Sequence, residues 1–134
     1  MYIIHAPQQY YFISIFRIVQ GAVGDCWLVA AFACASEFPD AIRRMFVTHE
    51  YNPRGLYKVR IYDPIKKKSV VVIVDDRIPC KKDTKRPRVM SPNGNELWAI
   101  ILEKAYAKFC GSYAALDGGV SVLIVDYCIE CLFL

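Results

Sequence analysis

Cys26 is placed where a thiol could act as a nucleophile. It directly follows the glycine-bearing turn 21–25 and precedes the apolar run 28–35, which lacks Pro and Gly. This pattern predicts a helix buried on all sides, with Asp25 as its N-cap and Cys26 in its first turn. The first N–H groups of a helix have no internal partners and the macrodipole is positive there, so a thiolate is stabilised. The thiol of Cys26 should therefore ionise easily and become a nucleophile.

Gln20 is the candidate partner of this cysteine. It lies upstream across two glycines, so a turn would bring its side-chain amide beside the sulfur. A Gln N–H and the backbone N–H of Cys26, aimed at one point, would form an oxyanion hole for acyl transfer. The alternative, a buried structural cysteine, leaves Gln20, the glycines and Asp25 unexplained. Cys34 is the contrast, because it lies inside the predicted helix and should be inert.

The spacing Gln-Gly-x-x-Gly-Asp-Cys-Trp at residues 20–27, followed by an alanine-rich helix, resembles the active-site segment of the calpains. The calpains are the papain-like cysteine proteases of the cell interior. Two later stretches resemble the same family, and they follow in the family's order. The first comprises residues 55–62 and 70–79, and the second comprises residues 95–108 and 111–119.

The resemblance covers residues 19–119, which we interpret as similar to the first subdomain of a calpain catalytic core. Residues 1–18 form a divergent N-terminal segment, with weak strand character at 10–18. Residues 120–134 form a divergent apolar tail, which either packs as an extra strand or reflects a truncated or misread gene. The resemblance implies an α+β fold, in which a central buried helix carries the cysteine beside a second long helix and a small antiparallel sheet.

The resemblance implies calcium-dependent, limited cleavage of cytoplasmic proteins through an acyl-thioester intermediate. Cys26 would attack the peptide carbonyl, while Gln20 and the Cys26 backbone N–H hold the oxyanion. Such a site also needs a histidine to take the thiol proton and an Asn or Asp to orient it. In cathepsin-type enzymes these residues lie about 130–150 residues beyond the cysteine. Only residues 27–134 follow Cys26 here.

The two histidines of the chain do not fit the role of the base. His5 precedes the cysteine, against the family order, and His49 lies close to a turn. We therefore expect a second catalytic subdomain to supply the His and Asn, and the isolated chain to be inactive. The alternative is a catalytically inactive calpain-like interaction or regulatory module. Another papain-superfamily thiol enzyme, such as a transglutaminase or deamidase, fits the spacing less well.

Calcium is the regulator that the resemblance implies. Glu96 matches a position whose carboxylate binds calcium in calpains, and it equally fits a first-turn carboxylate favoured by the helix dipole. Arg17 stands near the position where the family pattern supplies an acidic ligand, so we expect weak or absent calcium binding. The run 75–77 is interpreted as an ion pair or turn. The lone CxxC at 128–131 is a weak signal for zinc or redox chemistry.

The composition is typical of one globular domain. The chain has 134 residues, of which 55% are hydrophobic and 22% charged, so disorder is not expected. Its net charge of +4 does not by itself imply a nucleic-acid partner. We interpret the six cysteines as free thiols in a reducing compartment. No apolar segment is long enough to span a bilayer, and the N-terminus lacks the marks of a signal peptide.

Periodicity predicts the strands. Residues 56–62 alternate in polarity, which predicts a half-buried strand, and the β-branched run 70–74 predicts a more buried one. The two should form an antiparallel hairpin. A short strand is expected at 89–90. The basic loop 81–88 has no apolar residue to bury and is interpreted as solvated, with a contact to acidic lipid, nucleic acid or an acidic partner as the alternative.

Two further helices are expected. The helix that begins at Cys26 should end at about residue 37, because the residue before Pro39 is pushed out of the helical region. Asp40 should then cap a short helix over residues 41–46. A longer helix should run from its cap at Asn95 to about residue 109, where apolar residues recur at helical spacing. Gly111 should end it.

Overall fold

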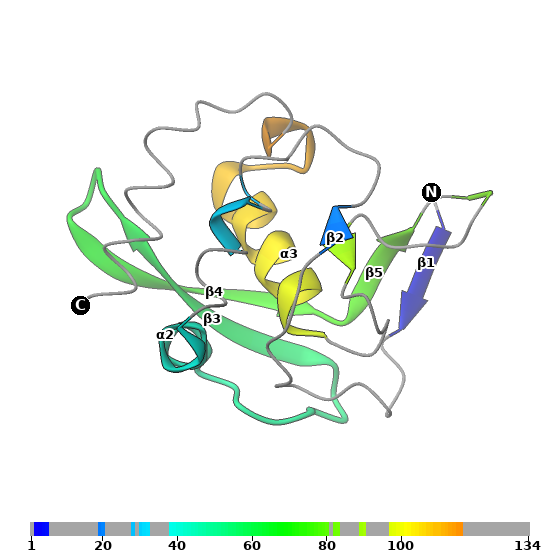
Figure 1. Cartoon of the computed structure of the whole chain (residues 1–134), viewed down its shortest axis with the longest axis horizontal. Helices are drawn as coiled ribbons and strands as arrows, with labels where there is room; N and C mark the ends of the chain where they lie inside the picture. Colours follow the sequence, from blue (N-terminus) through cyan, green and yellow to red (C-terminus); the bar gives the residue numbers. More distant parts are fainter. Residues whose placement is uncertain are drawn as a thin grey trace.

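A computed structural model describes residues 2–5, 19–20, 28, 30–32, 38–80, 82–83, 89–90 and 97–116. These residues form helices and two-stranded antiparallel sheets (Figure 1). Leu28 and residues 30–32 are helical. The other elements are β1 (Tyr2–His5), β2 (Val19–Gln20), α2 (Pro39–Met45), β3 (Leu56–Asp63), β4 (Lys68–Asp75), β5 (Arg77–Cys80), β6 (Val89–Met90), α3 (Trp98–Cys110) and the 3₁₀ helix η1 (Ala114–Leu116).

The β3–β4 hairpin confirms the predicted antiparallel pair. Every residue of β3 has a partner on β4, with Val59 opposite Val72. On β3 the alternating side chains of Tyr57, Val59 and Ile61 are buried, as the period-two pattern predicts. Figure 1 shows α3 lying across this hairpin, and α3 contacts both strands. One face of the hairpin therefore forms the floor of the core.

The prediction of a more buried strand at 70–74 is wrong for one face of β4. Val72 and Val74 are buried, but Val71 is 51% exposed and Ile73 is 44% exposed. An antiparallel pair needs to cover only one of its faces, so a β-branched run can place half of its side chains in water. The unbroken apolar run reflects strand propensity on this outer face rather than burial.

The long helix begins later than predicted. Leu97 occupies the N-cap of α3 and Trp98 is its first residue, so the prediction that Asn95 caps the helix is wrong. The helix ends at Gly111, as predicted, where a φ of 107° favours glycine. Most of α3 is buried, more than the predicted stripe: Trp98, Ala99, Ile100, Ile101, Leu102, Glu103, Ala105, Tyr106 and Ala107.

The short helix also begins differently. Phe38 is the N-cap of α2 and Pro39 takes the first helical turn, so Asp40 lies inside the helix and is not its cap. Proline suits this place because its φ is already helical and the N–H it lacks would have no partner. The Asp40 carboxylate instead pairs with Arg43, with 3.2 Å between Oδ1 and Nη1.

Two further strand pairs complete the described fold. β1 pairs with β5, placing His5 opposite Arg77, and β2 pairs with β6, placing Gln20 opposite Val89. The strand at 89–90 was predicted, whereas the strand character expected at 10–18 lies outside the described residues. Within the described part of the chain, no helix combines the length and the apolar character needed to cross a membrane.

Candidate functional site

The structure describes elements that flank the candidate site in the sequence. Cys26 and Glu96 lie outside the described residues, as does Arg17. Gln20 lies in β2, where its backbone pairs with Val89 of β6. The described geometry therefore concerns the elements on either side of the predicted nucleophile.

The helical residues that follow Cys26 pack against α3. The ring of Phe32 lies 6.4 Å from that of Trp98 and 5.8 Å from that of Tyr106, measured between centroids. Tilted pairs at this separation are favourable for aromatic rings. Leu28 is fully buried in the same core. This contact fixes the segment that begins just after the predicted nucleophile.

Ala30 departs from the prediction for this segment. Leu28, Ala31 and Phe32 are buried, whereas Ala30 is exposed. The prediction of a helix buried on all sides is therefore wrong at this position. The sequence could not reveal this, because alanine is compatible with either environment and the neighbouring residues are all apolar.

The strand that carries Gln20 is tied to the same helix. β2 pairs with β6, and β6 contacts α3. The backbone of Gln20 and the helical segment after Cys26 thus share α3 as a common support. The sequence predicted α3 as a core helix but gave no sign of this role, because the contacts join residues far apart in the chain.

Both histidines lie in the described part of the chain. His49 is exposed in an irregular segment between α2 and β3, as predicted for a surface histidine. His5 lies in β1 and pairs with Arg77 through the backbone.

Asp75 is held in an ion-pair cluster that confirms the interpretation of residues 75–77. Its Oδ2 lies 3.0 Å from Nε of Arg77, and its Oδ1 accepts a hydrogen bond from Lys104 of α3. Burial raises the pKa of Asp75, but the hydrogen bonds and positive charge of Lys104 and Arg77 outweigh it and hold this pKa below its ordinary value. Lys104 also donates to the carbonyl oxygens of Asp75 and Arg77. This role of Lys104 could not be predicted from the sequence, since one lysine on a helix predicts no particular partner.

The described carboxylates do not fit a calcium site. Calcium takes six to eight oxygen ligands in proteins. Among the described residues, no group of three or more Asp, Glu, His or Cys side chains could hold a metal ion. Asp75 is committed to Lys104 and Arg77. The Oδ1 of Asp63 accepts backbone N–H groups from the turn that follows it.

Two cysteines are described, and both are free thiols, as predicted. Cys80 is buried, and its Sγ donates to the carbonyl oxygen of Ile78 at 3.6 Å. Burial raises the pKa of the Cys80 thiol. Cys110 is exposed at the end of α3, although partial desolvation also raises the pKa of its thiol. A raised pKa makes both thiols poor nucleophiles at neutral pH.

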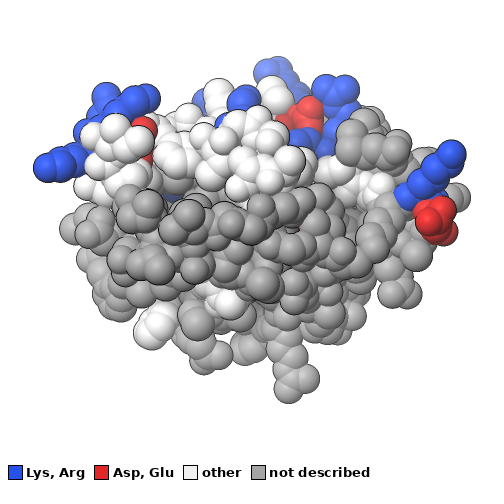
Figure 2. Space-filling model, turned by 90° about the horizontal axis from the view of Figure 1, so that it is seen from above, with Lys and Arg blue, Asp and Glu red and all other residues white. Residues whose placement is uncertain are grey.

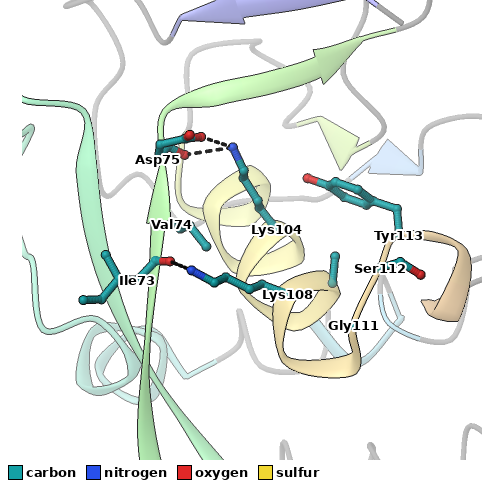
Figure 3. Close-up of a pocket in the computed structure, with 9 residues that line it drawn as sticks. Ile73, Val74, Asp75, Lys104, Lys108, Gly111, Ser112 and Tyr113 are labelled. Atoms are coloured by element: carbon teal, nitrogen blue, oxygen red, sulfur yellow. Dashed lines mark hydrogen bonds and ion pairs between the residues drawn. The ribbon is translucent and has the colours of Figure 1, made fainter.

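A cavity of about 300 Å³ opens between β4 and the C-terminal end of α3. Figure 3 shows Lys104 and Lys108 extending from α3 to β4, with Tyr113 on the opposite side. Lys108 Nζ donates to the carbonyl oxygen of Ile73 at 2.7 Å, while Lys104 is held by Asp75. None of the described residues that line this cavity is a cysteine or a histidine, so they do not provide the side chains that thiol chemistry requires.

Comparisons with known proteins agree with the resemblance. The sequence profile described as "Calpain family cysteine protease" matches residues 2–126. The chain is 47% identical to "Calpain-type cysteine protease DEK1" of Zea mays over 103 residues, which are 77% of this chain and 5% of that protein. It is 42% identical to "Calpain-1 catalytic subunit" of Homo sapiens over 106 residues, which are 76% of this chain and 14% of that protein.

A third relative gives the same picture. The chain is 39% identical to "Calpain-2 catalytic subunit" of Mus musculus over 107 residues, which are 78% of this chain and 15% of that protein. The chain therefore spans only a small part of the relatives it matches. The profile nevertheless covers nearly all of the chain itself. The chain belongs to the calpain family of cysteine proteases.

Proposed function

We propose that this chain supplies the nucleophile-bearing part of a calpain-type cysteine endopeptidase. The observation that carries the proposal is the shared support of the two predicted site segments. The strand of Gln20 and the helical residues after Cys26 are both fixed to α3 in a chain of the calpain family. A catalytic site requires its groups to be held within a fraction of an ångström of productive geometry, and a common rigid support provides this.

In the proposed reaction, the thiolate of Cys26 attacks the carbonyl carbon of a peptide bond. The developing oxyanion is held by the side-chain N–H of Gln20 and the backbone N–H of Cys26. A histidine first takes the thiol proton and then gives a proton to the leaving amine, which departs as an acyl-thioester forms. Water then hydrolyses the thioester and restores the thiol.

We assign the histidine and its orienting asparagine to a second catalytic subdomain. His49 is exposed, without the buried setting in which a base could be oriented beside Cys26. The exposed Ala30 supports this assignment, because it leaves one position beside the buried Leu28, Ala31 and Phe32 open to another surface. The substrates would be proteins inside the cell, cleaved at accessible extended segments.

The test uses a casein-type substrate and a second, His-bearing calpain subdomain expressed separately, with calcium present or absent. The full chain alone should show no turnover, because the leaving amine has no proton source. Adding the second subdomain should produce turnover that disappears in Cys26→Ala and falls roughly 100- to 1,000-fold in Gln20→Ala. Cys110→Ala is the matched control and should retain full activity, since this thiol lies at the exposed end of α3.

The outcomes separate the two readings of the chain. Turnover that survives Cys26→Ala would overturn the assignment of the nucleophile. Turnover by the chain alone that is lost in Cys26→Ala would overturn the assignment of the base, and His49 would be the first residue to replace. No turnover even with the second subdomain would favour a catalytically inactive interaction or regulatory module.

A further inference from the structure

The turn between β3 and β4 presents one isoleucine among three lysines. Ile65 is 92% exposed, the most of any large apolar side chain in the described residues. Lys66, Lys67 and Lys68 follow it directly, and all three are exposed. Figure 2 shows Lys and Arg side chains gathered at the end of the molecule where this turn lies in Figure 1. We call residues 65–68 the basic tip.

The exposure of Ile65 follows from how the turn is built. The side chain of Asp63 is buried at the base of the tip, and its Oδ1 accepts the backbone N–H groups of Ile65 at 3.0 Å and Lys66 at 3.1 Å. An Asp side chain that bonds the backbone two residues on is a stable turn-forming device. Lys67 then adopts a left-handed φ of 51° and returns the chain to β4. The fold thus holds the isoleucine in water.

The outer face of the hairpin also carries basic and aliphatic side chains. On β3 the exposed side chains include Lys58 and Arg60, and on β4 they include Val71 and Ile73. The register places Arg60 opposite Val71 and Lys58 opposite Ile73. Basic and aliphatic side chains therefore lie side by side from the basic tip along this face.

We propose that the basic tip docks on an anionic lipid surface. Ile65 would enter the boundary between headgroups and acyl chains, and the three lysines would contact the negatively charged headgroups. Charge complementarity identifies this partner, because anionic leaflets attract clusters of basic residues. The exposed Lys58 and Arg60 of β3 add to the three lysines of the tip. A modest apolar insertion combined with a basic cluster is the usual two-part basis of reversible membrane binding.

The isoleucine distinguishes lipid from the other polyanions. A nucleic-acid backbone would attract the lysines but would leave an aliphatic tip in water. A lipid interface attracts the lysines and also takes up the aliphatic side chain, which loses its contact with water there. The proposal is independent of the catalytic one, and Cys26→Ala should bind vesicles as the unaltered chain does.

The test is co-sedimentation of the full chain with vesicles of phosphatidylcholine alone or with about one-third phosphatidylserine. Binding should require phosphatidylserine and weaken as salt rises. Lys67→Gln should weaken it about fivefold. Ile65→Ser should weaken it roughly tenfold or more. Arg54→Gln is the matched control, because it removes an exposed cation from the turn that precedes β3 and should change binding less than about twofold.

The contrary outcomes are equally definite. Equal loss of binding in Lys67→Gln and Arg54→Gln, with none in Ile65→Ser, would mean general attraction to charge and would overturn the proposal. Binding of duplex DNA that depends on Lys67, without binding to vesicles, would also overturn it. Thermal unfolding checks that the variant is still folded. Ile65→Ser removes a side chain that is 92% exposed, so it should leave the unfolding temperature unchanged.

Discussion

The ring of Phe32 packs against the ring of Tyr106, with centroids 5.8 Å apart and planes inclined by 53°. Phe32 belongs to the helical segment that follows Cys26, and Tyr106 lies near the middle of α3. This pair, with Trp98 as a second contact of Phe32, connects the segment of the proposed nucleophile to the largest buried element described. Its loss should therefore affect both stability and the site.

Phe32→Ala should lower the free energy of unfolding by about 3–5 kcal/mol, because it removes a fully buried ring and leaves a cavity. Phe32 is 1% exposed. Urea denaturation of the full chain measures the change. Phe38→Ala is the matched control, since Phe38 is 56% exposed, and it should cost about 1 kcal/mol or less. Equal losses in the two variants would show that the ring of Phe32 is not a core contact.

The hairpin and α3 were predictable because their signals are local. Alternating polarity marks β3, and apolar residues at helical spacing mark α3. The pairing of β1 with β5 was not predicted. Each strand has only four residues, and the two lie far apart in the sequence, so no local pattern indicates that they pair.

For the candidate site too, the local features were predictable and the contacts between distant residues were not. Cys26 and Gln20 stand out through the spacing of a short motif, which the sequence displays directly. The contact of Lys104 with Asp75 could not be predicted, because it depends on how α3 lies across β4. The exposed outer face of β4 was missed because β-branched residues favour a strand whether or not they are buried.

Gly55→Ala should destabilise the fold by about 1–3 kcal/mol. Gly55 has a φ of 66°, and an added Cβ would lie 2.7 Å from Cγ of Asp76. The variant therefore combines backbone strain with a steric clash against a neighbouring carboxylate. Gly111→Ala is the control, because its φ of 107° is also strained for alanine but no atom lies within 4 Å of the added Cβ. Urea denaturation should show the larger loss for Gly55→Ala.

Stability should fall in acid through Asp75. Its pKa is lowered in the folded chain, so the contribution of its carboxylate is present above the ordinary value of about 4 and is lost as pH falls through the folded pKa. The difference in unfolding free energy between the unaltered chain and Asp75→Asn should therefore be largest at pH 7 and shrink toward pH 2. Urea denaturation at several pH values measures it.

Lys104 provides a second test of the same ion pair. Lys104→Met should cost about 1–3 kcal/mol at pH 7, because it leaves a half-buried carboxylate without its main donor. Lys108→Met is the control, since it removes a lysine one turn away that donates only to the carbonyl oxygen of Ile73 among the described contacts. A loss from Lys104→Met that does not shrink in acid would mean that Asp75 is not the partner that matters.

Calcium binding by the isolated chain should be weak or absent. Asp75 is committed to an ion pair and Asp63 to a turn, and Arg17 brings positive charge near the position where the family pattern supplies an acidic ligand. Titration calorimetry of the full chain should show no micromolar site. If such a site is found and Glu96→Gln abolishes it, the expectation is wrong and Glu96 is a ligand. Asp83→Asn removes an exposed carboxylate in a turn and should leave any binding unchanged.

Cys26 should be the first of the six thiols to react with limiting iodoacetamide at neutral pH. The rate of alkylation follows the fraction of thiolate, which a helix N-terminus increases. Burial raises the pKa of Cys80 and shields its sulfur, so it should react only when the chain unfolds. Cys110 is exposed with a raised pKa and should react at an intermediate rate.

Mass mapping of the labelled peptides gives the order of reaction. A chain unfolded in urea is the control, in which the differences should largely vanish. Labelling of Cys80 or Cys128 ahead of Cys26 in the folded chain would contradict the placement of Cys26 at a helix N-terminus.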